Sequence, residues 1–262
     1  GGMGKIYLGD DPRLERQVAI KVSSLAYEGT DPRFSKEAKV LAQLAHPNIV
    51  PVHDIGTDGQ GRPYYSMKLV KGRSLQAILN ALKNGTPEVV KEYPLPTLLT
   101  IFRKVCDAMA FAHSKRILHR DLKPDNIMVG EYGEVLVMDW GLAKTLGAAE
   151  EPGEAVNDAP KGGSTFTDAG LTMEGEVMGT PQYMSPEQAE GMVAELDERS
   201  DIYSLGGVLY AILTLRPPID GKTLNEVLTK VKSGSLSAME TRRGGTETVA
   251  VGAPAAMERN VP

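Results

Sequence analysis

One stretch of eight residues, from His119 to Asn126, limits what this chain can fold into more than any other. It reads His-Arg-Asp-Leu-Lys-Pro-Asp-Asn and so places Asp121, Lys123 and Asn126 in one short loop. These side chains offer an acceptor for a hydroxyl proton, a cation for a phosphate and an oxygen ligand for a metal ion. Because turns also favour Asp, Asn and Pro, a polar surface turn is the simplest explanation of this stretch on its own.

A second acidic residue follows at a fixed place in the pattern. Val135 to Met138 is typical of a short buried strand, and Asp139-Trp140-Gly141 comes directly after it. A surface turn does not explain a second candidate metal ligand at the end of a buried strand. We therefore interpret the two segments as parts of one phosphoryl-transfer site, with Asn126 and Asp139 as the metal ligands.

The loop resembles the catalytic loop of protein kinases, whose pattern H-R-D-L-x-x-x-N it matches at every fixed position. Other segments similar to that family follow its order along the chain. They are the end of a glycine-rich loop at Gly1 to Tyr7, the V-A-I-K strand at Val18 to Lys21, and Met184-Ser185-Pro186-Glu187, with Ser-Pro-Glu in place of Ala-Pro-Glu. The sequences of the segments from Met184 to Gln188 and from His46 to Val50 most resemble those of bacterial Hanks-type serine/threonine kinases.

The resemblance implies an α+β, bilobal protein-kinase fold. A small antiparallel sheet with one main helix would form the N-terminal lobe, residues 1–67, and a mainly helical C-terminal lobe would follow a hinge at 68–75. The C-terminal lobe would cover 76–232, including an activation segment at 139–187, and 233–262 would be a low-complexity tail. Since the start of the glycine loop and the family's final helices are missing, we expect a chain truncated at both ends.

Hydrophobic spacing predicts the main elements inside these lobes. Apolar residues at helical spacing indicate helices from about Asp31 to Ala45 and from Pro96 to Ala112, and a buried helix from Asp197 to Leu215. Strands are expected at Gln17 to Val22, near Val50 to Ile55 and near Tyr64 to Leu69.

The resemblance also implies a role for each site residue, with ATP and Mg²⁺ as cofactors. Lys21, held by Glu37, would reach the α and β phosphates, while Asn126 and Asp139 would hold Mg²⁺. Asp121 would orient the acceptor hydroxyl and take its proton, and Lys123 would steady the γ-phosphate. Asp201 would hold the catalytic loop from beneath, and His119 is expected to be a packed structural residue. The remaining nucleotide contacts would come from Gly1, Gly2, Gly4, Ile6, Ala19, Met67 at the gatekeeper position, Lys68 and Leu69 of the hinge, and Met128.

The implied activity is transfer of the γ-phosphoryl group of ATP to Ser or Thr hydroxyls of a protein substrate. Control by autophosphorylation is expected within the polar stretch from Thr145 to Glu176, a mobile loop with candidate sites at Ser164, Thr165, Thr167 and Thr172. Self-association would allow this reaction between copies.

Two alternatives stay open. One is a pseudokinase or scaffold, although such proteins usually lose Lys21, Asp121, Asn126 or Asp139. The other is a small-molecule phosphotransferase of the aminoglycoside-kinase type, which shares an Asp-Trp pair like Asp139-Trp140. The Gly179 to Glu187 segment, which resembles a protein-docking segment, favours a protein kinase.

Composition narrows the partners and the compartment. A formal net charge of −5 gives no electrostatic reason to expect nucleic acid as a partner. The single cysteine, Cys106, rules out an intrachain disulfide and favours a reducing cytoplasm. The longest apolar run, Leu205 to Leu215, is too short to cross a bilayer, so no membrane anchor is visible in this sequence.

Overall fold

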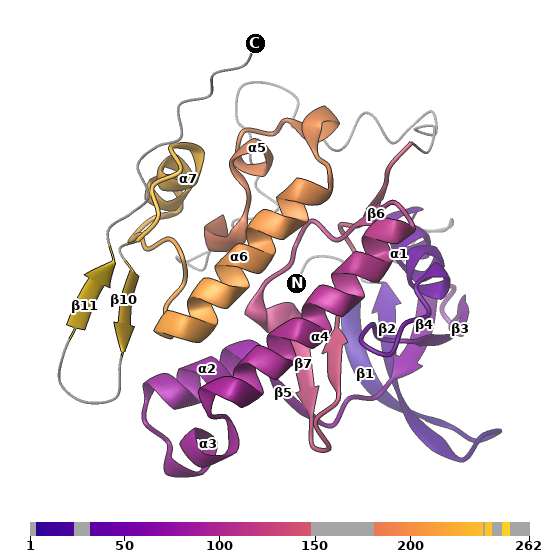
Figure 1. The fold of residues 1–262 in the computed structure, drawn as a ribbon. Helices are drawn as coiled ribbons and strands as arrows, with labels where there is room; N and C mark the ends of the chain where they lie inside the picture. Colours follow the sequence, from indigo (N-terminus) through magenta and orange to yellow (C-terminus); the bar gives the residue numbers. More distant parts are fainter. Residues whose placement is uncertain (1–3, 24–31, 148–180, 238, 243–247, 252–262) are drawn as a thin grey trace.

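A computed structural model describes residues 4–23, 32–147, 181–237, 239–242 and 248–251. Figure 1 shows a sheet-containing lobe built from the N-terminal quarter of the chain beside a lobe that consists mainly of helices. The α+β, bilobal fold predicted from the sequence is confirmed.

The N-terminal lobe contains a four-stranded antiparallel sheet with the strand order β1-β2-β4-β3. One helix, α1, packs against it through buried Phe34, Ala38 and Leu41, and buried Leu44 directly follows the helix, so that these residues recur every three or four positions. The ring of Phe34 lies 5.2 Å from that of Tyr65 and so ties α1 to β4. The elements are β1 (Gly4–Asp11), β2 (Arg16–Ser23), α1 (Pro32–Gln43), β3 (Val52–Thr57) and β4 (Pro63–Lys68).

The C-terminal lobe is organised around two long helices, α4 (Leu95–Ser114) and α6 (Glu198–Thr214), which run side by side (Figure 1). Four shorter helices accompany them: α2 (Leu75–Lys83), α3 (Pro87–Glu92), α5 (Pro186–Ala189) and α7 (Leu224–Lys232). Short 3-10 turns form at Pro124–Asn126, Pro181–Tyr183 and Val193–Glu195.

Two small sheets lie next to these helices and carry the loops of the candidate site. One has the order β5-β7-β8, and the other pairs β6 with β9. Their strands are β5 (Gly72–Ser74), β6 (Ile117–Leu118), β7 (Ile127–Gly130), β8 (Val135–Val137) and β9 (Lys144–Thr145). The loop from His119 to Asn126 therefore stands between β6 and β7, and Asp139 follows β8.

The segment after α1 connects the two lobes. The backbone N–H of Val137 donates to the carbonyl of Asn48 over 2.9 Å, and the Asn48 side chain donates to the carbonyl of Val135 over 2.9 Å. Strand β8 is consequently attached to the N-terminal lobe just before it delivers Asp139. An ion pair of 2.6 Å between Lys68 of β4 and Glu134 of the β7–β8 turn adds a second connection.

The predicted helices and strands agree with these bounds to within a few residues. The expected strand near Val50 to Ile55 starts two residues later, at Val52, and a register shift between Val52 and Asp54 interrupts its pairing. The stretch 68–75, expected to be a hinge, contains the end of β4 and the whole of β5.

The tail contains an antiparallel hairpin that the sequence did not predict. Strand β10 (Met239–Arg242) pairs with β11 (Thr248–Val251), and both belong to the stretch expected to be a low-complexity tail. Neither Met239–Arg242 nor Thr248–Val251 shows the strict alternation of apolar and polar residues that would have indicated a strand.

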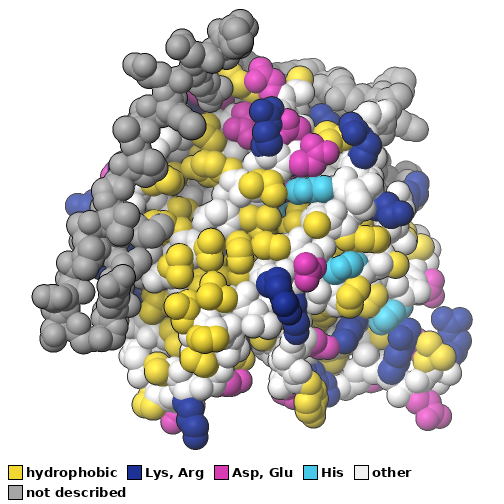
Figure 2. Space-filling model, in the orientation of Figure 1, with side chains coloured by type: hydrophobic (Ala, Val, Ile, Leu, Met, Phe, Trp, Pro, Cys, Tyr) yellow, Lys and Arg dark blue, Asp and Glu magenta, His cyan; other side chains and the backbone are white. Residues whose placement is uncertain are grey.

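Hydrophobic side chains gather on the face where α4 and α6 run together (Figure 2). The more exposed apolar residues of these two helices are Leu95, Leu99 and Ile202, each more than 40% exposed. None of the helices in the described residues has the length and apolar character needed to span a lipid bilayer.

Candidate active site

A buried ion pair anchors the part of the site that lies in the N-terminal lobe. The Nζ atom of Lys21 lies 2.7 and 2.8 Å from the two carboxylate oxygens of Glu37. The Lys21 side chain is 10% exposed and that of Glu37 is fully buried, so each charge is compensated mainly by the other and not by water. The predicted contact between these two residues is confirmed.

Tyr65 completes this pair and was missed in the sequence. Its hydroxyl donates a hydrogen bond of 2.8 Å to Glu37 Oε1. Burial, followed by the charge of Glu37, raises the pKa of Tyr65 far above its usual value, so the hydroxyl keeps its proton and remains a donor. Its place follows from strand register, because Tyr65 stands directly across from Lys21 in the β2–β4 pairing, and the sequence alone carried no signal for that pairing.

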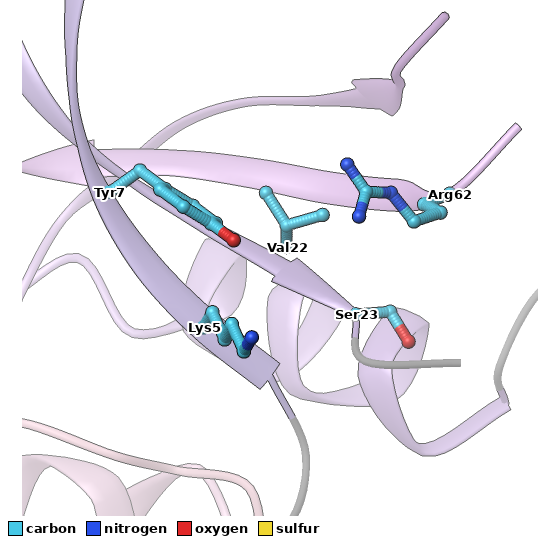
Figure 3. Close-up of a pocket in the computed structure, with 5 residues that line it drawn as sticks. All are labelled: Lys5, Tyr7, Val22, Ser23 and Arg62. Carbon is cyan, nitrogen blue, oxygen red and sulfur yellow. The ribbon is translucent and has the colours of Figure 1, made fainter. Parts of the chain in front are cut away.

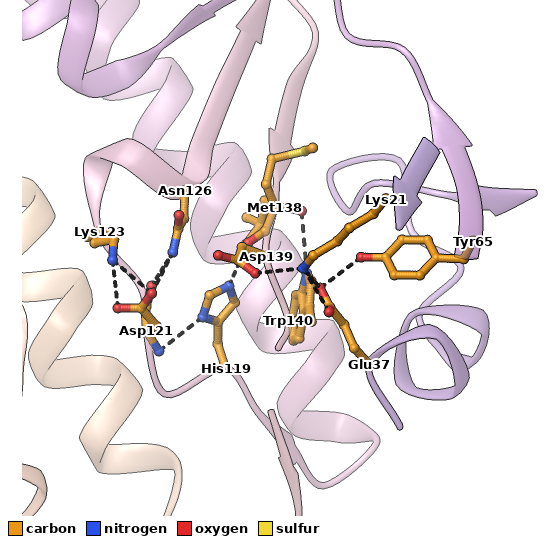
Figure 4. A network of polar contacts seen from close by, with 11 residues as sticks. Lys21, Glu37, Tyr65, His119, Asp121, Lys123, Asn126, Met138, Asp139 and Trp140 are labelled. Carbon is orange, nitrogen blue, oxygen red and sulfur yellow. Dashed lines mark hydrogen bonds and ion pairs between the residues drawn. The ribbon is translucent and has the colours of Figure 1, made fainter. Parts of the chain in front are cut away.

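Asp139 comes from the C-terminal lobe and faces the same lysine (Figure 4). Its Oδ1 atom lies 3.4 Å from Lys21 Nζ, and its side chain is 53% exposed. The residue has a φ of +57°, in the left-handed region that few side chains favour. Buried Trp140 anchors this turn, since its indole N–H donates to the carbonyl of Val137 over 3.4 Å.

The catalytic-loop residues form a compact cluster around Asp121. Lys123 Nζ lies 2.8 and 3.0 Å from the Asp121 carboxylate oxygens. The Asn126 amide nitrogen donates to the Asp121 backbone carbonyl over 2.8 Å and to its Oδ2 over 3.0 Å. Because the nitrogen is used in this way, the amide oxygen of Asn126 is the atom left to face a cation.

His119 connects this cluster to Asp139. Its Nε2 atom lies 3.0 Å from the Met138 carbonyl and must donate, whereas its Nδ1 atom accepts the Asp121 backbone N–H over 3.2 Å. These two bonds require the neutral ring with its proton on Nε2. The ring is fully buried against Trp140 at 4.6 Å, which confirms that His119 is a packed structural residue. Figure 4 shows the resulting chain of contacts from Asp121 to Lys21.

Asp201 of α6 holds the catalytic loop from beneath, as predicted. Its carboxylate accepts the backbone N–H groups of His119 and Arg120, each at 2.9 Å, and the ring N–H of His113 at 2.8 Å. Burial alone would raise the pKa of Asp201, but these hydrogen bonds outweigh it and hold the pKa below its usual value. A buried carboxylate is thus kept ionised by three donors.

The expected nucleotide contacts lie beside this network. Ala19 and Met67 are buried cross-strand neighbours, and Ile6 pairs with Lys21 and is 62% exposed. A Cβ atom on Gly4 would stand 2.5 Å from the Val22 carbonyl oxygen, so the β1–β2 pairing requires glycine there. Lys68, Leu69 and Met128 are half-buried, and Gly1 and Gly2 lie outside the described residues.

The donor chemistry fits magnesium held together with a nucleotide. Within the described residues no group of three His, Cys, Asp or Glu side chains could hold a metal ion. Asn126 and Asp139 instead offer two oxygen ligands, and Mg²⁺ characteristically takes one or two protein oxygens and completes its shell with phosphates and water.

A separate pocket of about 100 Å³ lies on the N-terminal sheet, lined by Lys5, Tyr7, Val22, Ser23 and Arg62 (Figure 3). Lys5 is paired with Val22, and adjacent residues of a strand point to opposite faces. The pocket therefore opens on the face of β2 opposite to the Lys21 side chain and does not belong to the site.

The end of the expected activation segment packs against α6. Ser200 donates a hydrogen bond of 2.6 Å to the Glu187 carboxylate, and Ser204 donates to the Tyr183 carbonyl over 2.9 Å. Ser185 caps α5 with a reciprocal capping box that involves Gln188. Ser164, Thr165, Thr167 and Thr172 lie outside the described residues.

Comparison with known proteins shows similarity to protein kinases over most of the chain. Residues 1–254 match the model of the protein kinase domain. The chain is 42% identical over 233 residues to the serine/threonine-protein kinase PknD of Protochlamydia amoebophila, covering 86% of this chain and 23% of that protein. It is 39% identical to the PknD kinases of Chlamydia felis and of Chlamydia trachomatis serovar D, covering 85% and 83% of this chain and 24% of each relative.

The chain thus spans about a quarter of the length of the curated relatives it matches. The match to the domain model covers nearly all of the sequence and includes every residue of the site described above. This chain belongs to the protein kinase domain family.

Proposed function

We propose that this chain is the catalytic domain of a serine/threonine protein kinase that uses ATP and Mg²⁺. The observation that carries the proposal is the convergence of the Lys21–Glu37 pair, Asp139 and the Asp121 cluster on one site. Membership of the protein kinase domain family and the likeness to PknD kinases support it. Lys123-Pro124 after Asp121 favours Ser or Thr over Tyr as the acceptor. That this protein lies in the cytoplasm remains a prediction.

The proposed reaction forms a bond from the acceptor hydroxyl oxygen to the γ-phosphorus and breaks the bond between that phosphorus and the β–γ bridging oxygen. ADP leaves, and the hydroxyl proton passes to the Asp121 carboxylate. Mg²⁺, when bound through Asn126 and Asp139, would supply positive charge to the phosphates. Lys21 positions the α and β phosphates while Glu37 holds it in place, and Lys123 neutralises charge on the transferred group.

Both alternatives receive less support from the same residues. A pseudokinase would not need the contacts that orient Lys123 and Asn126 on Asp121. A small-molecule phosphotransferase would explain Asp139-Trp140. Trp140 is, however, buried with its ring 4.6 Å from that of His119, so packing alone accounts for a tryptophan at this position.

The test is transfer of labelled phosphate from γ-labelled ATP with Mg²⁺ to a mixture of Ser-, Thr- and Tyr-containing peptides. We expect phosphoserine or phosphothreonine as the product. Asp139→Asn should abolish transfer because it removes the carboxylate ligand, whereas Asp107→Asn, an exposed residue of α4, should leave the rate unchanged. Nucleotide binding without transfer in the unmodified protein would favour a pseudokinase, and phosphorylation of an aminoglycoside instead of peptides would favour the other alternative.

Control by autophosphorylation is a second part of the proposal. It rests on Arg120, which directly precedes Asp121, and on the four hydroxyl residues Ser164, Thr165, Thr167 and Thr172. A phosphate carries about −1.5 to −2 charges near neutral pH and forms charge-assisted hydrogen bonds with arginine. Mass spectrometry after incubation with ATP and Mg²⁺ should find phosphate on this stretch, and the fourfold Ala variant should be less active. Full activity of that variant would remove the support for such control.

A further inference from the structure

Gln188 joins the end of the docking segment to the catalytic loop through a single side-chain amide. Its Nε2 atom donates a hydrogen bond of 2.7 Å to the backbone carbonyl of Arg120, which lies 68 residues earlier. Its Oε1 atom accepts the backbone N–H of Ser185 over 3.1 Å. Both ends of the amide are therefore engaged, one in α5 and the other in the loop that carries Asp121.

The contact fixes the peptide bond that leads into Asp121. Gln188 holds the carbonyl of that bond, and His119 Nδ1 accepts its N–H, which belongs to Asp121, at 3.2 Å. Arg120 has a φ of +69°, so the peptide starts from a backbone conformation that needs support from its surroundings. With both atoms of the peptide bonded, the direction in which the Asp121 side chain leaves the backbone is set.

Asp201 cannot bind the carbonyl of Arg120. Its carboxylate is an acceptor, and it holds the N–H groups of His119 and Arg120. A carbonyl oxygen requires a donor, and the half-buried amide of Gln188 provides one. The two residues therefore hold complementary groups of the same turn, from α6 and from α5.

Capping of α5 does not explain the contact with Arg120. The capping box uses the Oε1 atom of Gln188 and the Oγ atom of Ser185, and it would be complete with the Nε2 atom facing solvent. The bond from Nε2 to the Arg120 carbonyl is thus additional to the cap, and it is the shortest hydrogen bond that Gln188 makes.

We propose that Gln188 is a positioning residue for phosphoryl transfer. It sets the Asp121 carboxylate relative to the acceptor hydroxyl and keeps the catalytic loop in register with Tyr183 to Ser185, the end of the docking segment. The inference rests on the proposed kinase function. It assigns to Gln188 an effect on the rate of transfer and none on the binding of ATP, because the hydrogen bonds of its side chain in the described residues go to Ser185 and Arg120 and not to Lys21, Glu37 or Asp139.

Gln188→Glu removes one hydrogen bond of the amide, to the Arg120 carbonyl, and keeps the other, from the Ser185 N–H. The variant keeps an oxygen for the Ser185 N–H and replaces the donor with a carboxylate oxygen that repels the Arg120 carbonyl. We expect kcat to fall about 10- to 100-fold, in line with the cost of a small misplacement of a reacting group, while the KM for ATP stays within about twofold. Gln76→Glu is the matched control, since the half-buried Gln76 amide of α2 also donates a side-chain hydrogen bond, to Asn80 over 2.9 Å, and it should retain the unmodified rate.

The pH profile distinguishes positioning from a general loss of structure. A protonated glutamic acid donates an O–H to a carbonyl, so the kcat of Gln188→Glu relative to the unmodified protein should recover as the pH is lowered. Gln188→Ala has no group to protonate and should show a constant deficit. Equal kcat values in the unmodified protein and both variants would overturn the proposal, as would a deficit in Gln188→Glu that does not change with pH.

Hydrogen exchange tests the same geometry without activity. In Gln188→Ala the amide of Asp121 should exchange faster, while amides of β2 should exchange at the unmodified rate. If the unmodified protein transfers no phosphate, the proposed function fails, and this exchange experiment still decides whether Gln188 holds the loop. Unchanged exchange at Asp121 would contradict the inference in either case.

Discussion

The ammonium group of Lys21 lies 3.4 Å from the carboxylate of Asp139, although 118 residues separate the two in sequence. Lys21 belongs to the N-terminal lobe and Asp139 to the C-terminal lobe, so this contact brings the lobes together at the candidate site. The same ammonium group is closer to Glu37, at 2.7 Å. Its position therefore depends on a buried carboxylate on one side and a half-exposed carboxylate on the other.

Replacing Glu37 with Gln should destabilise the fold and weaken ATP binding. The change leaves the buried Lys21 charge without its main partner, a loss that typically costs about 3–5 kcal/mol. Urea unfolding should show this loss, and the KM for ATP should rise because Lys21 is no longer held. Glu92→Gln is the matched control, since Glu92 pairs with Arg73 at 2.9 Å but is 53% exposed, and it should cost less than about 1 kcal/mol. Similar losses in the two variants would contradict this account of the pair.

Replacing Tyr65 with Phe should have a smaller effect on the same pair. The variant removes the hydroxyl that donates to Glu37 and should lower the free energy of unfolding by about 1.5–3 kcal/mol, the range for hydrogen bonds to charged groups. Because the Tyr65 pKa is raised far above the working range, this difference should be the same from about pH 6 to pH 9. Tyr64→Phe, at the neighbouring half-buried position, should change stability less, and an equal change would argue against a special role for Tyr65.

Replacing Asp201 with Asn should make the free energy of unfolding less dependent on pH in the acidic range. The pKa of Asp201 is lower in the folded protein than in the unfolded chain, so its ionised form stabilises the fold above about pH 4. That contribution is lost as the pH falls through the folded pKa. The difference in unfolding free energy between the unmodified protein and the variant should therefore be largest near neutral pH and shrink on acidification.

Exposed Asp220→Asn serves as the control for this measurement and should leave the pH dependence unchanged. A difference between Asp201→Asn and the unmodified protein that stays constant down to about pH 2 would show that the carboxylate charge is not what matters.

Much of this site could be predicted from short sequence patterns. The spacing of Asp121, Lys123 and Asn126 places them in one turn whatever surrounds it, and the apolar periodicity of α1 was enough to place Glu37 on a helix. Its pairing with Lys21 was implied by the resemblance to protein kinases. These predictions depend on neighbours in sequence, where local geometry determines which side chains share a face.

The residues that the sequence did not reveal depend on long-range geometry. Tyr65 reaches Glu37 through the register of β2 against β4, and Gln188 reaches Arg120 across 68 residues. The strand expected near Val50 to Ile55 begins at Val52 as β3, and its pairing with β4 shifts register between Val52 and Asp54, which the sequence did not indicate. A single sequence carries no direct signal for register or for such distant contacts.

The most direct test of the proposed mechanism is a pair of measurements on Asp121→Asn. The substitution keeps the size of the side chain but removes the carboxylate that we propose takes the hydroxyl proton. ATP affinity, measured by titration in the presence of Mg²⁺, should stay within about twofold, while phosphoryl transfer should fall about 10²- to 10⁴-fold. A loss of ATP affinity with an unchanged rate of transfer at saturating ATP would contradict the account, because Asp121 would then bind the nucleotide and not act on the acceptor.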